Sequence, residues 1–311
     1  MSLAHIFQEH PQRRYIMFGG KGGLGKTTFS AAAAYHLAQQ GFRVLVFSVD
    51  PQASLSDIFE RDIYGKGPVE IMPNLFAQEI DADQHIRAYQ DEIRNKILDM
   101  YGMEEVPEEI ESYIQAAAAE PAMEVYYLSM ASVYDEWIDK ITKLREEMAE
   151  YSKVASLIQR DKELEEDMIL KELLDIKYRI NTSSGILTDK EKTAFFFVII
   201  PEEMALIDTL KAAELFAKFQ VPLCGYVVNR VIPPELGQQN IPAYLRNRLE
   251  MQERYLIRID ELFGEQVLAQ IPEFERDITG LPMIEKMAEA MFGMVTESST
   301  APPRSVEGAK P

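Results

Sequence analysis

Short apolar runs alternate with longer helical patterns at both ends of the chain. The runs have the length and the β-branched and aromatic content of buried strands, and they lie at residues 15–18, 43–49, 75–80, 195–200, 225–231 and 267–271. Helical patterns follow three of them, at residues 29–40, 204–219 and 279–293. Alternating strands and helices favour a parallel sheet that helices cover on both faces. We therefore predict an α/β fold with a doubly wound, mostly parallel sheet.

The middle of the chain has a different pattern, which divides the predicted fold. Residues 83–185 are helical in character, with charged residues, long apolar side chains and few glycines. We expect them to form a helical insertion subdomain between the two parts of the α/β core, residues 1–82 and 186–294. Residues 1–14 are predicted to be a short polar arm, and residues 295–311 a disordered tail.

A glycine-rich stretch joins the first apolar run to the first helical pattern. Residues 20–27 fit the phosphate-binding pattern G-x-x-x-x-G-K-[ST], in the order strand, loop and helix that such a site requires. Backbone N–H groups of this kind of loop, together with the start of the helix, bind phosphate oxygens. The residues predicted to bind a nucleotide are Gly20, Lys21, Gly22, Gly23, Leu24, Gly25, Lys26, Thr27 and Thr28. A chance match in a glycine-rich turn is the alternative.

Two residues of this loop and one later aspartate have separate expected roles. Lys26 would bind the β- and γ-phosphates and take part in catalysis, and the Thr27 hydroxyl would bind Mg²⁺. Asp50 follows the second apolar run, and the carboxyl ends of parallel strands are where α/β sheets bind ligands. We expect Asp50 to orient the attacking water and to lie on the Mg²⁺ side of the site. In the alternative interpretation, Ser54 or Asp57 simply caps the next helix.

Composition limits the remaining classes of function. The chain has 32 basic and 51 acidic residues and a net charge of −19, which argues against a nucleic-acid partner. The single cysteine, Cys224, excludes an internal disulfide and a cysteine-pair zinc site, and the four histidines lack metal-ligand spacing. The sequence has no run of 18 apolar residues and no apolar signal region, so we expect a cytoplasmic protein without a transmembrane segment.

Lys21 is a second lysine inside the loop, in the sequence G-K-G-G-x-G-K-T-T. This spacing resembles the deviant Walker A motif of the family that contains the arsenite-pump ATPases, the tail-anchored-protein targeting ATPases and the partitioning ATPases. The resemblance implies a homodimer that sandwiches its nucleotides, with Lys21 as a catalytic cation that reaches into the partner's site. Asp50-Pro51 with Leu55-Ser56-Asp57 is similar to the first switch of this family, although Ser54 replaces the asparagine usual in the targeting branch.

Three later segments also resemble this family. Pro201–Ala205 is similar to its Pro-Glu-Glu-Met segment, which implies that Glu202 approaches the nucleotide. Val227–Arg230 is similar to its adenine-recognition segment, which implies an adenine contact for Asn229. Ile271–Phe274 is similar to the loop over the base, which implies that Pro272, Glu273 and Phe274 bind nucleotide. Each segment alone is as readily structural, and their order along the chain carries the resemblance.

One segment of the family pattern is missing. The family has a second switch, Asp-Thr-Ala-Pro-Thr-Gly-His, at the end of a central apolar strand, whereas here Glu124-Val125 is followed directly by Tyr126. Either the printed sequence joins two segments that further residues separate in the native polypeptide, or the protein lacks this strand. We favour the first explanation, because deleting a central buried strand would cost more than the ~5–15 kcal/mol that stabilises a domain.

The resemblance implies an ATP hydrolase of the arsenite-pump type. It would be a Mg²⁺-dependent homodimer in which hydrolysis moves the helical subdomain on behalf of an anion or metalloid export partner in the membrane. Arsenite itself fits poorly as an effector, because one cysteine cannot provide a three-thiolate As(III) site.

Two alternatives stay open. The insertion holds six methionines, which suit either a helical core or an adaptable apolar surface: Met100, Met103, Met123, Met130, Met148 and Met168. Such a surface would belong to a targeting ATPase that binds hydrophobic protein segments. The missing switch instead favours a nucleotide-gated scaffold with little hydrolysis.

Overall fold

The structure is a computed structural model of the 311-residue chain. It describes residues 12–48, 55–80 and 181–293, together with a few single positions outside these ranges. Four of the features expected above lie outside the described residues. They are the Asp50 carboxylate, most of the helical insertion, the junction at residues 125–126 and the C-terminal tail.

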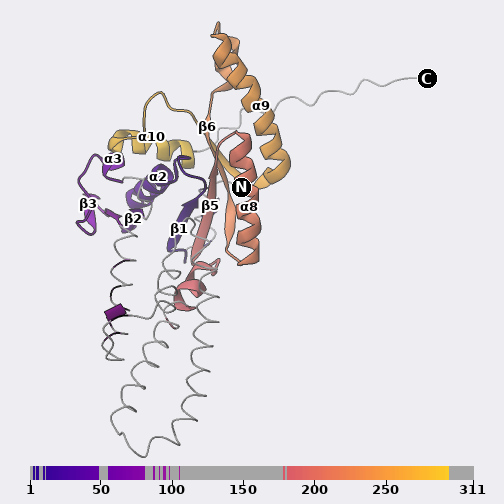
Figure 1. The fold of residues 1–311 in the computed structure, drawn as a ribbon. Coiled ribbons are helices and arrows are strands. Elements are labelled where there is room, and N and C mark those ends of the chain that lie inside the picture. Colours follow the sequence, from indigo (N-terminus) through magenta and orange to yellow (C-terminus); the bar gives the residue numbers. More distant parts are fainter. Residues whose placement is uncertain are drawn as a thin grey trace, which may run out of the picture.

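In the described part of the chain, the main sheet contains four parallel strands. They are β1 (Tyr15–Gly19), β5 (Thr193–Ile199), β6 (Leu223–Val231) and β7 (Val267–Pro272), in the spatial order β1-β5-β6-β7. Strands from both ends of the sequence therefore lie side by side. β1 and β5 are neighbours in the sheet (Figure 1), although residues 20–192 separate them in the sequence. Parallel strands place all their carboxyl ends at one edge, where α/β proteins bind ligands.

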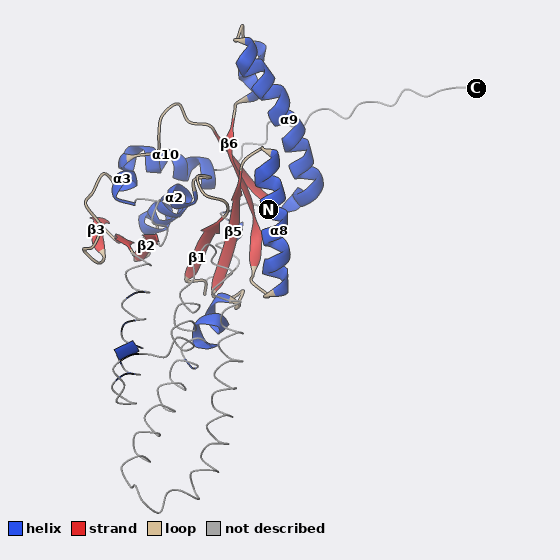
Figure 2. Ribbon diagram, in the orientation of Figure 1, coloured by secondary structure: helices blue, strands red, loops and turns tan. Residues whose placement is uncertain are grey.

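Helices pack on both faces of this sheet, as the alternating sequence pattern predicts. Helices α2 (Lys26–Gln39) and α10 (Gly280–Phe292) share one core with the sheet, and α8 (Glu203–Lys218) and α9 (Ala243–Phe263) share the other (Figure 2). The short 3₁₀ turns η1 (Pro234–Gln238) and η2 (Gly264–Gln266) flank α9. The doubly wound α/β prediction is confirmed.

Strand β5 is buried along its whole length and separates the two cores. Successive side chains of a strand point to opposite faces, so Phe196 packs on the α2 side and Phe195 on the α8 side. The Phe196 ring stacks on Phe18 of β1 with a centroid distance of 5.3 Å, and the Phe195 ring meets Phe216 of α8 edge-on at 4.4 Å. These aromatic contacts fix β5 beside the strand that leads into the glycine-rich loop.

A second, smaller sheet lies beside the first. Strand β2 (Val44–Ser48) runs parallel to β4 (Leu75–Glu79), and β3 (Val69–Met72) pairs antiparallel with β4 in a hairpin that the sequence pattern did not reveal. Helix α3 (Leu55–Phe59) precedes this hairpin. Helix α2 packs against both β1 and β2, but within the described residues no strand joins the two sheets.

The prediction that β2 is buried is wrong for one face of the strand. Val46 packs in the core shared with α2, whereas Leu45 and Phe47 are 47% and 54% exposed. The reason is the alternation of side chains along a strand, because α2 lies only on the face to which Val46 points.

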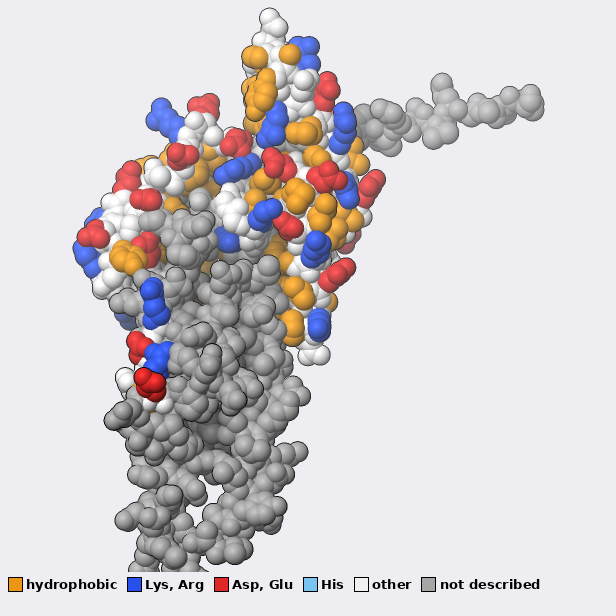
Figure 3. All heavy atoms as spheres, viewed as in Figure 1, with side chains coloured by type: hydrophobic (Ala, Val, Ile, Leu, Met, Phe, Trp, Pro, Cys, Tyr) orange, Lys and Arg blue, Asp and Glu red, His pale blue; other side chains and the backbone are white. Residues whose placement is uncertain are grey.

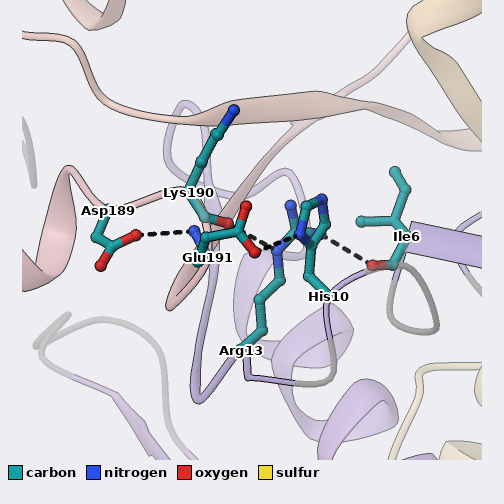
Figure 4. Close-up of polar contacts among 6 residues, drawn as sticks. All are labelled: Ile6, His10, Arg13, Asp189, Lys190 and Glu191. Carbon is teal, nitrogen blue, oxygen red and sulfur yellow. Dashed lines mark hydrogen bonds and ion pairs between the residues drawn. The ribbon is translucent and has the colours of Figure 1, made fainter.

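The prediction of a polar N-terminal arm at residues 1–14 is also wrong in part. Leu3 and Ile6 are almost fully buried in the same core as α2. Figure 4 shows how the following residues are fixed: Arg13 donates from Nη1 to the Ile6 carbonyl at 2.9 Å and from Nε to the Lys190 carbonyl at 3.2 Å. His10 Nδ1 lies 2.9 Å from a carboxylate oxygen of Glu191. The N-terminal residues are therefore tied to the turn that leads into β5.

Candidate functional site

The glycine-rich loop occupies residues 20–25, between the carboxyl end of β1 and the start of α2. Gly20, Gly23 and Gly25 have φ angles of 142°, 78° and 97°, which L side chains rarely adopt. Gly25 is the N-cap of α2 and forms no side-chain cap. The N–H groups of the first helical turn therefore have no capping side chain, and such groups bind anions.

Two of these glycines also allow a close approach to neighbouring strands. A Cβ atom on Gly20 would lie 2.6 Å from the Val198 carbonyl oxygen of β5, and one on Gly25 would lie 2.8 Å from Asn229 Nδ2 of β6. By contrast, no atom lies within 4 Å of a Cβ placed on Gly22. The loop is thus packed against the strand ends at its first and last glycines and is open in between.

The two lysines of the loop have different surroundings. Lys26 Nζ donates to the Gly20 carbonyl at 3.0 Å, which places its ammonium group across the mouth of the loop. Lys21 Nζ forms an ion pair at 3.0 Å with Asp208 of α8, and the two side chains are 51% and 38% exposed. In the single chain, then, the additional lysine is bound by a carboxylate of its own subunit.

A cavity of about 420 Å³ opens at the carboxyl ends of β5, β6 and β7. Its lining includes three residues predicted to bind nucleotide, Glu202, Glu273 and Phe274. Arg248 of α9 closes one side through an ion pair from Nη2 to Glu202 Oε1 at 3.3 Å. A volume in the range of ~300–1,000 Å³ is typical of pockets for small molecules. The structure thus brings segments about 70 residues apart in sequence to one pocket, next to the phosphate-binding loop.

Asn229 and its neighbour Arg230 contact the loop itself. Asn229 Nδ2 donates to the Leu24 carbonyl at 2.8 Å, and Arg230 Nη2 donates to the Gly23 carbonyl at 3.2 Å. Asn229 is not among the residues that line the cavity, whereas Arg230 is. Sequence reasoning missed Arg230, although a cation at the carboxyl end of a parallel strand was a signal that could have indicated it.

The remaining predicted residues lie around this site. Thr27 and Thr28 belong to the first turn of α2, and Pro272 ends β7 opposite Val231. Within the described part of the chain, no group of three His, Cys, Asp or Glu residues is suited to a metal ion. Mg²⁺ at a phosphate site uses one or two protein oxygens, substrate phosphates and water. The Thr27 hydroxyl is the described group that fits this role.

Comparison with known proteins identifies the family. The model of the anion-transporting ATPase family matches residues 13–126 and 124–293 of this chain. The chain belongs to the anion-transporting ATPase family. The predicted resemblance and the prediction of an ATPase are thereby confirmed.

Individual relatives of this ATPase align with most of its sequence. A protein of Aquifex aeolicus (strain VF5) named "Putative arsenical pump-driving ATPase 1" is 31% identical over 314 residues, which cover 90% of this chain and 79% of the relative. The ATPase GET3C of Arabidopsis thaliana is 25% identical over 324 residues, with 90% and 83% covered. The ATPase GET3 of Podospora anserina is 27% identical over 310 residues, with 89% and 90% covered.

The family match is divided at one point. Its two stretches overlap at residues 124–126, the point at which we expect the second switch. The alignment with the Aquifex ATPase also extends over 314 residues while covering only 90% of this chain, so the relative has residues inside the matched region that this chain does not have. No helix in the described part of the chain combines the length and the apolar composition that a membrane span requires.

The packing of the loop glycines predicts which of them tolerate a side chain. Gly20→Ala and Gly25→Ala should lower the thermal unfolding midpoint of the nucleotide-free protein by roughly 4 °C or more, because each new methyl group meets a polar atom and strains the backbone. Gly22→Ala is the matched control and should leave the midpoint unchanged. Equal midpoints for all three variants in differential scanning calorimetry would contradict this packing.

Proposed function

We propose that this family ATPase hydrolyses Mg²⁺-bound ATP as a homodimer, with the phosphates bound by the loop Gly20–Thr28. The observation that carries the proposal is the uncapped start of α2 behind a glycine-rich loop, with Lys26 Nζ across its mouth. N–H groups, a helix start and an ammonium group together favour a polyphosphate. The cytoplasm, where ATP is abundant, is the proposed location.

Each side chain of the site has a proposed role in this reaction. Lys26 neutralises charge on the β- and γ-phosphates, the Thr27 hydroxyl holds Mg²⁺, and Asp50 orients the water that attacks the γ-phosphate. When bound, Mg²⁺ supplies charge neutralisation at the phosphate oxygens. The adenine base of ATP would lie near Glu202, Asn229 and the segment Pro272–Phe274, beside the cavity of about 420 Å³.

Lys21 is proposed to act on the nucleotide of the second subunit. Its ion pair with Asp208 is largely exposed, and exposed pairs contribute only ~0–1 kcal/mol to stability. A triphosphate carries far more negative charge than one carboxylate, so it can displace Asp208 as the partner of this lysine. Charge from a second lysine would then stabilise the transition state.

The proposed cycle moves the helical insertion, residues 83–185, to serve an anion or metalloid export partner in the membrane. The name of the Aquifex relative supports an arsenical pump. The single thiol argues against arsenite as a direct ligand. Cys224 is half-buried, and burial raises its pKa, so less of the ligating thiolate is present. On the face seen in Figure 3, basic and acidic side chains are interspersed over α8 and α9, which supports the proposal that nucleic acid is not a partner.

A second candidate is a targeting ATPase that binds hydrophobic protein segments. The GET3 relatives and the six methionines of the insertion favour it, since unbranched methionine adapts to varied apolar ligands. An apolar peptide should stimulate turnover of a targeting ATPase, whereas a metalloid anion should stimulate that of an export ATPase.

We also propose that the native polypeptide has further residues between Val125 and Tyr126, which supply the central strand and second switch. The separation of β1 from β2 and the division of the family match at residues 124–126 support this. Mass spectrometry of the protein purified from its natural source should give a mass clearly above 35.5 kDa, the mass of the printed chain. A mass of 35.5 kDa would contradict the proposal and favour a nucleotide-gated scaffold.

Hydrolysis is tested by release of inorganic phosphate from Mg²⁺-ATP. Lys26→Ala should lower the rate about 10²–10³-fold, because a preorganised charge at the transferred phosphate is lost. Lys218→Ala removes a lysine from the end of α8 and should retain the wild-type rate. If the wild-type protein in excess over Mg²⁺-ATP binds the ATP but releases no phosphate from it above the rate in buffer, the ATPase cycle is contradicted and the scaffold is supported.

The action of Lys21 on the second subunit is tested by mixing two inactive variants. Lys21→Ala and Asp50→Asn should each lose activity in a homodimer. A mixed dimer keeps one complete site, with Asp50 from one subunit and Lys21 from the other, so mixing should restore phosphate release. If the mixture stays inactive although mixed dimers form, Lys21 acts within its own subunit.

A further inference from the structure

The end of strand β6 has an irregularity that redirects two neighbouring side chains. In the pairing of β6 with β7, Val228 lies opposite Gln270 and Val231 opposite Pro272, so β6 advances three residues while β7 advances two. Arg230 sits within this bulge and has a φ of 57°, in the left-handed region that non-glycine residues rarely occupy. Bulges of this kind turn side chains away from their regular alternation.

The bulge allows two consecutive residues to reach the same loop. In a regular strand, Asn229 and Arg230 would point to opposite faces of the sheet. Instead, Asn229 donates to the Leu24 carbonyl at 2.8 Å and Arg230 to the Gly23 carbonyl at 3.2 Å. The two side chains therefore bind the carbonyl groups of two consecutive peptide units in the phosphate-binding loop.

The direction of these carbonyl groups decides where the adjacent N–H groups point. In a trans peptide unit, the C=O and N–H bonds point in opposite directions. With the Gly23 and Leu24 carbonyls held toward β6, the N–H groups of Leu24 and Gly25 are turned away from β6. Consecutive N–H groups on one side of a loop form an anion-binding nest.

We propose that Asn229 and Arg230 are positioning residues that hold the phosphate-binding loop in its anion-binding conformation before the nucleotide arrives. The inference rests on the proposed function, because it requires that the loop bind polyphosphate. It assigns Asn229 a role other than the adenine contact that the family resemblance implies. The approach is close enough that a Cβ atom on Gly25 would lie 2.8 Å from Asn229 Nδ2.

The two roles of Asn229 differ in their dependence on the base, which provides the test. Calorimetry on the full-length protein compares Mg²⁺-ATP with Mg²⁺-tripolyphosphate, which has the phosphates but no base. Asn229→Ala should weaken both ligands by the same factor, on the order of 5- to 10-fold, because one hydrogen bond that orders the loop is lost. Weaker binding of ATP with unchanged binding of tripolyphosphate would show an adenine contact and overturn the inference.

The test of Arg230 must separate the effect of its hydrogen bond from the effect of its charge. Arg230→Gln keeps an N–H donor for the Gly23 carbonyl without the charge, and Arg230→Ala removes both. We expect Arg230→Gln to bind tripolyphosphate at least threefold more tightly than Arg230→Ala, because it keeps a hydrogen bond to the Gly23 carbonyl. Equal losses would mean that only charge matters and would overturn the role of Arg230. Arg254→Ala, an exposed α9 arginine, controls for net charge and should bind as wild type.

The same titrations distinguish this inference from the proposed function. If the wild-type protein binds neither ligand, the proposed function is wrong and the loop has no anion to be positioned for. If the wild type binds both and only the pattern among the variants differs, the ATPase proposal stands and the positioning role alone is wrong.

Discussion

A loop presents its N–H groups to a polyphosphate only if its carbonyl groups point the other way, because the C=O and N–H bonds of a trans peptide unit point in opposite directions. In this protein the requirement is met at the carboxyl edge of the main sheet. Asn229 and Arg230 donate hydrogen bonds to two loop carbonyl groups, and Lys26 donates to a third, that of Gly20. The order of strands places β6 near enough for this contact, although it lies more than 200 residues away in sequence.

This arrangement explains which parts of the site the sequence could predict. Local signals were sufficient for the loop, since glycines, Lys26 and the following helix are contiguous, and for strand β5, whose residues 194–199 are all apolar. Contacts between distant segments were not predictable. The Lys21–Asp208 ion pair and the bulge at Arg230 depend on how α8 and β6 pack, and no local pattern encodes either. The exposed Phe47 shows the same limit, because composition does not reveal which face of a strand is covered.

The separation of β1 from β2 connects the fold to the proposed cycle. Helix α2 spans both sheets, so it links the loop to the strand that leads toward Asp50. On the proposed function, ATP binds at the start of α2, and α2 transmits the change to this second sheet, whose strand β4 precedes the insertion in the sequence. The Lys21–Asp208 pair would be broken in the dimer, which would leave Asp208 of α8 without this lysine when the second nucleotide is engaged.

In the proposed function, backbone N–H groups at the start of α2 bind the phosphates of ATP. Amide hydrogen exchange of the full-length protein measures this binding, with peptides that cover residues 20–28 followed with and without Mg²⁺-ATP. We expect exchange in this segment to slow strongly when ATP binds, while the exposed surface of α9 is unchanged. Protection elsewhere in the chain, with unaltered exchange at residues 20–28 under saturating ATP, would contradict it.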